Sequence, residues 1–269
     1  QGRLTLSSEA RAALERGEEK AQEALTTYER HNADFPLWRE AIAQGRQALS
    51  LAPDHPAPLR FLAEAYSITL WYARAWEMWL RYEAAGGLLD PEARDMLARV
   101  GTQLGYLRYE RGDLAGALEY YLQVIDRVPQ DTEAYVWAGR ISLELGQPEG
   151  AVPYWQEVLR RDPADSRAAY FLGLSHEQAR WGAEAVDAFY EGVGLYEQGY
   201  LGEAQLRFAS ASELNPDYTE AWAWLGRTHF EQGNYRAARR AYRRARDLDP
   251  GNETYRYFVQ ESRRLTDEQ

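Results

Sequence analysis

The stretch TEAWAWLGRTHFEQGNYRAARRAYRRARDLDPGN, residues 219–252, decides the fold of this chain. Its first half carries side chains three and four positions apart, which share one face of a helix: Trp222, Leu225 and His229. Its second half repeats that spacing with Ala238, Tyr242 and Ala245. Gly233 separates the halves and Pro250 follows the second. Because glycine and proline end helices, the stretch predicts a hairpin of two antiparallel helices.

The landmarks of this hairpin return at a fixed spacing of thirty-four residues along the preceding chain. They are the mid-helix glycines Gly105, Gly139 and Gly173, the alanines Ala117, Ala151 and Ala185, and the prolines Pro129 and Pro163, with Pro216 and Pro250 giving the interval once more. A sustained period of this length predicts a solenoid, in which each two-helix unit buries its apolar face against its neighbours.

The order of residues within the unit resembles the tetratricopeptide repeat pattern of a large residue, Leu-Gly, an aromatic, then Ala, an aromatic, Ala and Pro. The resemblance covers most of the chain. It implies an all-α solenoid of antiparallel helix hairpins wound into a superhelix, with the first helix of each unit on the concave face. It also implies a non-catalytic scaffold that binds peptide or helical segments of partner proteins in a groove on that face.

The period and its interruption predict that the chain is divided into two lobes. An N-terminal lobe, 1–182, is expected to hold a divergent first unit at 8–55, units at 56–89, 90–131 and 132–165, and the start of a unit at 166–199. A C-terminal lobe, 183–269, is expected to hold a helix at 183–198, a helix at 200–214, the unit at 219–252 and a capping helix at 253–266. Asp90-Pro91-Glu92 combines an N-cap, a first-turn proline and a first-turn acid, and predicts a lengthened helix from about Pro91.

The period breaks between Pro163 and Pro216, which lie fifty-three residues apart, or one unit and nineteen residues. One helix of the two-helix cycle is therefore missing. Ala185 matches the second helix of the preceding unit, whereas Gly192 matches the first helix of the next unit. We expect one helix at about 183–198 to serve both units as an irregular junction. The alternative is a non-helical linker, because glycines weaken a helix and four lie here: Gly192, Gly194, Gly199 and Gly202.

The mid-helix glycines need a packing reason, because a glycine there costs roughly 1 kcal/mol relative to alanine. We expect Gly226 and its equivalents to face alanines of the second helix, so that the two helix axes approach closely.

Composition excludes several classes of function. The 269 residues carry a net charge of −11, which opposes attraction to nucleic acid and to anionic membranes. No apolar run approaches the roughly 18 residues of a membrane span. The absence of Cys excludes disulfides and a cysteine nucleophile. A single Lys among 31 basic residues is typical of a heat-adapted or GC-rich source. The opening Gln1-Gly2 favours an extracytoplasmic location, periplasmic or secreted, over a cytoplasmic one, as after signal cleavage.

The sequence carries no complete motif for a cofactor, a metal ion or catalysis, so we expect no enzyme activity, no cofactor and no metal site. Gly192-Val193-Gly194 starts a dinucleotide fingerprint but follows no predicted strand. His176-Glu177 starts a zinc-protease pattern, but Arg180 stands where the second zinc-binding His is required.

Three surfaces remain as candidates for binding. By register with the family, the groove residues are Arg60, Tyr106, Tyr109, Arg140, Tyr170, Arg227 and Phe230, with Glu64, Leu174 and Glu231 beside them. A phosphate or nucleic-acid-binding adaptor is the alternative, through an arginine-rich helix at 235–246 with Arg236, Arg239, Arg240, Arg243, Arg244 and Arg246. Trp71 follows a turn that lacks the usual glycine, and either packs between repeats or belongs to a partner patch. A regulatory repeat domain of a larger enzyme is a further alternative.

Overall fold

The computed structural model describes residues 5–268, so Gln1-Gly2, on which the expected location depends, lies outside the described range. Within that range every regular element is an α-helix, fourteen in all, which confirms the all-α class. The chain divides into two compact units, Gln1–Leu145 and Gly146–Gln269. The expected boundary between lobes at 182/183 falls inside the second unit and stays a prediction.

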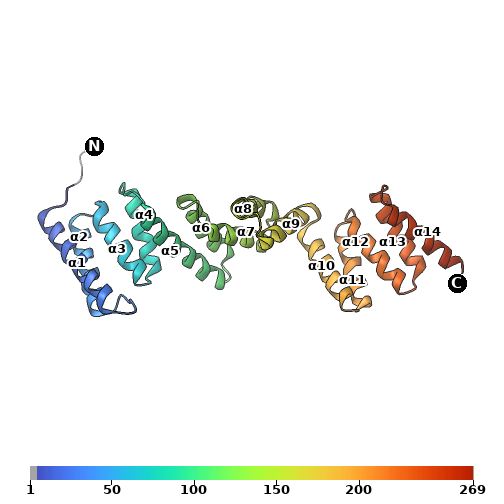
Figure 1. Ribbon diagram of the computed structural model, residues 1–269, viewed down its shortest axis with the longest axis horizontal. Coiled ribbons are helices and arrows are strands. Elements are labelled where there is room, and N and C mark those ends of the chain that lie inside the picture. Colours follow the sequence, from blue (N-terminus) through green and yellow to red (C-terminus); the bar gives the residue numbers. More distant parts are fainter. Residues whose placement is uncertain (1–4, 269) are drawn as a thin grey trace. The chain divides into compact units, whose positions relative to one another are not determined.

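The first unit is a stack of helices in which each packs on the next in chain order (Figure 1). Hairpins form between α1 and α2, between α3 and α4, and between α5 and α6, and α7 packs on α6. The helices are α1 (Ser8–Thr27), α2 (Pro36–Leu51), α3 (Pro56–Ile68), α4 (Tyr72–Ala84), α5 (Pro91–Glu110), α6 (Leu114–Arg127) and α7 (Thr132–Glu144).

The second unit is built in the same way (Figure 1). Its helices are α8 (Pro148–Arg161), α9 (Ser166–Trp181), α10 (Ala183–Glu197), α11 (Leu201–Leu214), α12 (Thr219–Glu231), α13 (Tyr235–Leu248) and α14 (Glu253–Asp267). The predicted capping helix is confirmed as α14, which packs on α13 and stacks Phe258 on Tyr242 at 4.8 Å between ring centroids. None of the described helices is long and apolar enough to cross a membrane.

Aspartates start four of the helices. The side chains of Asp90, Asp113, Asp131 and Asp165 accept hydrogen bonds of 2.9–3.0 Å from the backbone N–H three residues later. Such a cap stabilises a helix by about 1 kcal/mol. Asp90 precedes Pro91, the first residue of the 20-residue helix α5, so the predicted long helix is confirmed.

Two of the mid-helix glycines, Gly105 and Gly226, face aromatic rings, so the expectation that they face alanines was wrong for this pair. A Cβ placed on Gly105 would lie 2.8 Å from the ring of Tyr121 on α6, and one on Gly226 would lie 2.8 Å from Tyr242 on α13. The ring of the second helix lies across the glycine and fills the space that a side chain would take. Close approach of the helices therefore depends on a glycine–aromatic pair.

The junction at 183–198 is a single helix, α10, so the non-helical alternative was wrong. A Cβ on Gly192 would lie 2.8 Å from Phe208 on α11, which is the contact that Gly105 makes with Tyr121. Gly173 on α9 has nothing within 4 Å of an added Cβ. Although α10 also touches α9, it forms its hairpin with α11. Helix α10 therefore makes the first-helix contact of the hairpin α10–α11, and its expected second role as the partner of α9 stays a prediction.

Four of the turns within hairpins use a left-handed residue. Three of them have glycine with φ between 73° and 84°: Gly112, Gly199 and Gly233. In the turn between α3 and α4 this conformation is adopted by Leu70, at φ 62°, the one such non-glycine residue in the described range. A left-handed leucine costs roughly 1–2 kcal/mol, because its Cβ approaches the following carbonyl oxygen.

Candidate functional site

The predicted groove residues lie on the first helices of the repeats, but the structure brings only some of them together. In the first unit, Tyr106 and Tyr109 on α5 lie next to Arg140 on α7 through the indole of Trp137. In the second unit, Arg227 and Phe230 share α12 and line one pocket. Tyr170 on α9 is 57% exposed, and its ring contacts the neighbouring Phe171 edge-on.

A cluster of four side chains forms where α5 meets α7. We call it the N-cluster, and it consists of Tyr109, Trp137, Arg140 and Glu144. The Arg140 Cζ atom lies 5.3 Å from both the Tyr109 and the Trp137 ring centroids. Arg140 Nε and the Tyr109 hydroxyl each donate to Glu144 Oε1 at 2.9 Å. The guanidinium is thus fixed by two rings and one carboxylate, although the Arg140 side chain is 49% exposed.

The same arrangement recurs where α10 meets α12. We call it the C-cluster, and it consists of Tyr196, Trp224, Arg227 and Glu231. The Arg227 Cζ atom lies 5.1 Å from both ring centroids, and Arg227 Nε donates to Glu231 Oε1 at 3.2 Å. The Tyr196 hydroxyl also donates to Glu231. The Arg227 side chain is 52% exposed.

Each member of the C-cluster follows its N-cluster counterpart by eighty-seven residues. That spacing is two repeats plus the nineteen residues of the extra helix. The Tyr–Trp ring centroids are 5.1 Å apart in both clusters. Trp137 also stacks on Tyr121, and Trp224 stacks on Phe208, so each cluster rests on the aromatic ring that covers its hairpin glycine.

The sequence prediction missed half of these residues. It selected Tyr109, Arg140 and Arg227, with Glu231 beside them, and passed over Trp137, Glu144, Tyr196 and Trp224. The spacing of eighty-seven residues was the available signal, because it places identical residue types at four positions. The thirty-four-residue period alone does not relate these positions, because eighty-seven is not a multiple of thirty-four.

The tyrosines of both clusters act as hydrogen-bond donors. Burial, followed by the hydrogen bond to Glu144, raises the pKa of Tyr109 above its ordinary value. Burial and the hydrogen bond to Glu231 raise the pKa of Tyr196 in the same way. Both hydroxyls therefore keep their protons at neutral pH and direct them at the carboxylates.

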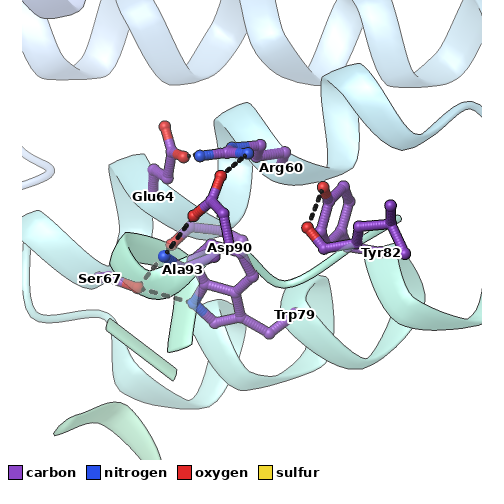
Figure 2. A network of polar contacts seen from close by, with 9 residues as sticks. Arg60, Glu64, Ser67, Trp79, Tyr82, Asp90 and Ala93 are labelled. Carbon is purple, nitrogen blue, oxygen red and sulfur yellow. Dashed lines mark hydrogen bonds and ion pairs between the residues drawn. The ribbon is translucent and has the colours of Figure 1, made fainter. Parts of the chain in front are cut away.

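Arg60 has a different environment from the other predicted groove arginines (Figure 2). Its Nε donates to Glu64 at 2.7 Å, and its Nη1 donates to Asp90 at 2.6 Å. The Ala93 backbone N–H and then Arg60 lower the pKa of Asp90, which caps α5. Arg60 thus connects α3 to the start of α5, and both ends of its guanidinium are already engaged by carboxylates.

A pocket of about 580 Å³ lies beside the C-cluster, bounded by α12, α13 and α14. Arg227 and Glu231 line one side of it. The remaining lining is mostly aromatic: Trp224, Phe230, Tyr242, Tyr255 and Phe258, with Ala223 and Thr254. Aromatic walls with one exposed guanidinium and one carboxylate suit a peptide that inserts an apolar side chain and presents its backbone to the charged pair.

The six arginines of the predicted anion patch lie on α13, and they differ in their surroundings. Arg244 contacts Asp217 at 3.4 Å and Arg246 contacts Asp247 at 2.7 Å. Arg236, Arg240 and Arg243 share one exposed helix face and form no ion pair with a described carboxylate. Arg239 is half-buried, and its Nε has no hydrogen-bond partner. No group of three His, Cys, Asp or Glu suited to a metal ion occurs among residues 5–268.

Comparisons with solved structures give distant matches. A tetratricopeptide repeat protein from Parabacteroides merdae is 13% identical over 95% of this chain and 99% of its own, with a TM-score of 0.40. Pseudomonas aeruginosa PilF is 17% identical over 94% of this chain and 97% of its own, with a TM-score of 0.32. YrrB, described as a tetratricopeptide repeat protein with an unusual peptide-binding site, is 18% identical over 79% of this chain and 96% of its own, with a TM-score of 0.33.

Sequence comparison identifies the repeat itself. Peroxisome biogenesis protein 5 of Arabidopsis thaliana is 39% identical over 62 residues, which are 23% of this chain and only 8% of that protein's length. Two family models described as tetratricopeptide repeat match residues 102–154, 138–200 and 195–261. These matches run without a gap from the second half of α5 into the capping helix α14, which is more than half of the chain. The chain therefore belongs to the tetratricopeptide repeat family.

Proposed function

We propose that this protein is a non-catalytic scaffold that binds peptide segments of partner proteins along its first helices. The N-cluster and the C-cluster are the recognition points. The observation that carries this proposal is the construction of one four-residue arrangement twice, with its guanidinium half-exposed each time. An exposed ion pair contributes only about 0–1 kcal/mol to stability, so folding alone gives little reason for the repetition.

The geometry of the clusters suits an interface. A guanidinium held against two aromatic rings loses little conformational freedom on binding, and arginine, tyrosine and tryptophan are the residues that most often dominate interface energies. Arg140 and Arg227 each use Nε for the carboxylate of their own cluster. A partner's backbone carbonyl or carboxylate would engage the outer edge of the guanidinium.

The pocket beside the C-cluster supports a preference for peptides with a bulky apolar side chain. Such a side chain would enter between Phe230, Tyr255 and Phe258, while the peptide backbone runs past Arg227 and Glu231. Burying it contributes roughly 1.5–3 kcal/mol of transfer free energy.

Selection from a library of random peptides displayed on phage tests the proposal. We expect enriched peptides to bind the purified chain, and Arg227→Ala or Phe258→Ala to weaken that binding about tenfold, because each removes an interface anchor. Arg256→Ala on α14 is the matched control, since Arg256 is exposed and does not line the pocket. Enriched peptides that bind wild type, Arg227→Ala and Arg140→Ala equally would exclude both clusters as recognition points.

An adaptor for phosphate groups or nucleic acid is the second candidate. Its support is the exposed α13 face carrying Arg236, Arg240 and Arg243 without described carboxylate partners, against a net charge of −11. Fluorescence anisotropy with a labelled single-stranded oligonucleotide tests it. Binding that weakens steeply with salt and disappears when all three arginines become Glu supports this role, and no binding at low salt removes it.

A further inference from the structure

A second pocket, of about 560 Å³, lies in the first unit between the start of α4, the end of α5 and α6. Its floor and walls are largely apolar: Trp71, Ala73, Leu104 and Leu107, with Tyr72 and Tyr120. Three arginines complete the lining: Arg74, Arg108 and Arg111. No acidic residue lines the pocket. We call it the cationic pocket.

The cationic pocket is separate from the groove residues of the same helix. Leu104, Leu107 and Arg108 of α5 and its C-cap residue Arg111 line the pocket, spaced three and four apart along one face. Tyr106 and Tyr109 project from the opposite face, because each residue advances about 100° around a helix. A ligand in this pocket would therefore leave the N-cluster unoccupied.

The positive charge of the pocket is mostly uncompensated. Neither Arg74 nor Arg111 forms an ion pair with a described carboxylate, and both are exposed. Arg108 contacts Asp113 at 3.0 Å. The Arg108 side chain is 50% exposed, so this ion pair is weak and a ligand carboxylate can replace Asp113. In a chain of net charge −11, three arginines around an apolar hollow form a local field of opposite sign.

The turn before α4 shapes one wall of this pocket. Leu70 adopts its left-handed conformation there with a side chain 58% exposed, where other repeats have glycine. The Trp71 backbone N–H donates to the Tyr66 carbonyl oxygen at 2.9 Å, and the Trp71 ring stacks on Tyr66 with an interplanar angle of 4°. Arg74 Cζ lies 5.4 Å from the centroid of the Trp71 ring, and Trp71 is 38% exposed. The indole and the guanidinium are therefore presented to the pocket as a fixed pair.

We propose that the cationic pocket binds an acidic segment of a partner protein that inserts one aromatic or large aliphatic side chain. The inserted side chain packs on Trp71, Leu104 and Leu107. Aspartate or glutamate residues on either side of it pair with Arg74 and Arg111. Charge complementarity selects this occupant, because a neutral segment would leave the guanidiniums facing an apolar partner, and a basic one would be repelled.

Fluorescence anisotropy with a panel of labelled octapeptides tests the proposal. The peptides vary two properties independently: their flanking residues are acidic, neutral or basic, and their central residue is Trp, Leu or Ser. We expect acidic peptides with central Trp or Leu to bind most tightly, and raising the salt to about 0.5 M to weaken them. Arg74→Glu combined with Arg111→Glu should lower their affinity by roughly tenfold or more.

Two control variants make the result specific. Arg11→Glu reverses an exposed charge on α1, outside the pocket, and should leave binding unchanged. Arg227→Ala should weaken binding of the peptides selected for the groove about tenfold without affecting the acidic panel, so that failure of one proposal can be told from failure of the other. Circular dichroism checks that each variant keeps its helices.

Four outcomes would overturn the proposal. Equal or tighter binding of neutral or basic peptides would exclude an acidic occupant, and so would no measurable binding of the panel. Tighter binding of a labelled single-stranded oligonucleotide, lost in the Arg74→Glu, Arg111→Glu variant, would assign the pocket to nucleic acid. Self-association in sedimentation velocity that disappears in that variant would assign it to a second copy of this chain.

Discussion

Two hairpins in this protein have the same glycine–aromatic contact but follow different neighbours. The hairpin α5–α6 follows a complete hairpin, α3–α4, whereas α10–α11 follows α9, which packs on α8 and also contacts α10. In both, a first-helix glycine lies under an aromatic ring of the second helix, and that ring stacks on the tryptophan of the next first helix. The preceding helix therefore does not determine which helix of a hairpin acts as the first helix of the repeat. The glycine, the covering ring and the tryptophan of the next first helix determine it.

The largest expected effect comes from removing the rings that cover the glycines. Tyr121 and Phe208 are both fully buried. We expect Phe208→Ala and Tyr121→Ala each to lower the free energy of unfolding by about 3–5 kcal/mol, because each leaves a cavity. Urea denaturation followed by circular dichroism measures both. A loss under about 1 kcal/mol in one variant only would show that the hairpins are not equivalent.

Two glycines of α10 should respond oppositely to alanine. A Cβ on Gly192 would meet Phe208 at 2.8 Å, so Gly192→Ala should destabilise by about 1–3 kcal/mol through overpacking. Gly194 has open space and its counterpart in α5 is Leu107, so Gly194→Ala should stabilise by about 0.5–1 kcal/mol through helix propensity. The same denaturation experiment compares them. Stabilisation by Gly192→Ala would contradict the first-helix assignment of α10.

Tyr121→Phe gives the hairpin α5–α6 the same ring that Phe208 provides in the hairpin α10–α11. The Tyr121 hydroxyl is buried without a hydrogen-bond partner, and burial raises the pKa of this tyrosine strongly. Its removal should stabilise the protein by about 1 kcal/mol, because an unsatisfied buried polar group carries a desolvation cost. Thermal unfolding measures the change. A clear loss of stability would mean that the hydroxyl has a partner in solution.

The smallest effect concerns His229, whose counterpart eighty-seven residues earlier is Ser142. Burial, then Arg240, lowers the pKa of His229 below its ordinary value of 6.5. The unfolded chain therefore binds this proton more readily, and the stability contributed by neutral His229 is lost as the pH falls from about 7 through 6.5. We expect His229→Ser to flatten the pH dependence of the free energy of unfolding between about pH 7 and 5. An unchanged slope would show that His229 does not contribute.

The sequence was sufficient for the fold because its signals are local. Asp90 and Pro91 mark the start of α5, and the break in period predicts one helix at α10, since caps and helical periodicity act within a few residues. Which residue faces Gly105 was not predictable in this way. That contact depends on the relative shift of two packed helices, which the spacing of alanines does not report.

For a related reason, only part of the candidate site could be predicted from the sequence. Family register selected Arg140 and Arg227 from their position within single repeats. The tyrosine and tryptophan that hold each guanidinium come from two successive first helices, so they become neighbours only through stacking of the repeats. The cationic pocket is similar, because its arginines lie on both α4 and α5.

The direct test of the account is whether the two clusters recognise the same ligand. Nine tryptophans give indole N–H resonances in a nitrogen-15 spectrum, and substitution assigns those of Trp137 and Trp224. On titration with a peptide selected against the wild-type chain, we predict that these two resonances shift together, whereas that of the fully buried Trp38 stays in place. Saturating binding that leaves both the Trp137 and the Trp224 resonances unmoved would contradict the account.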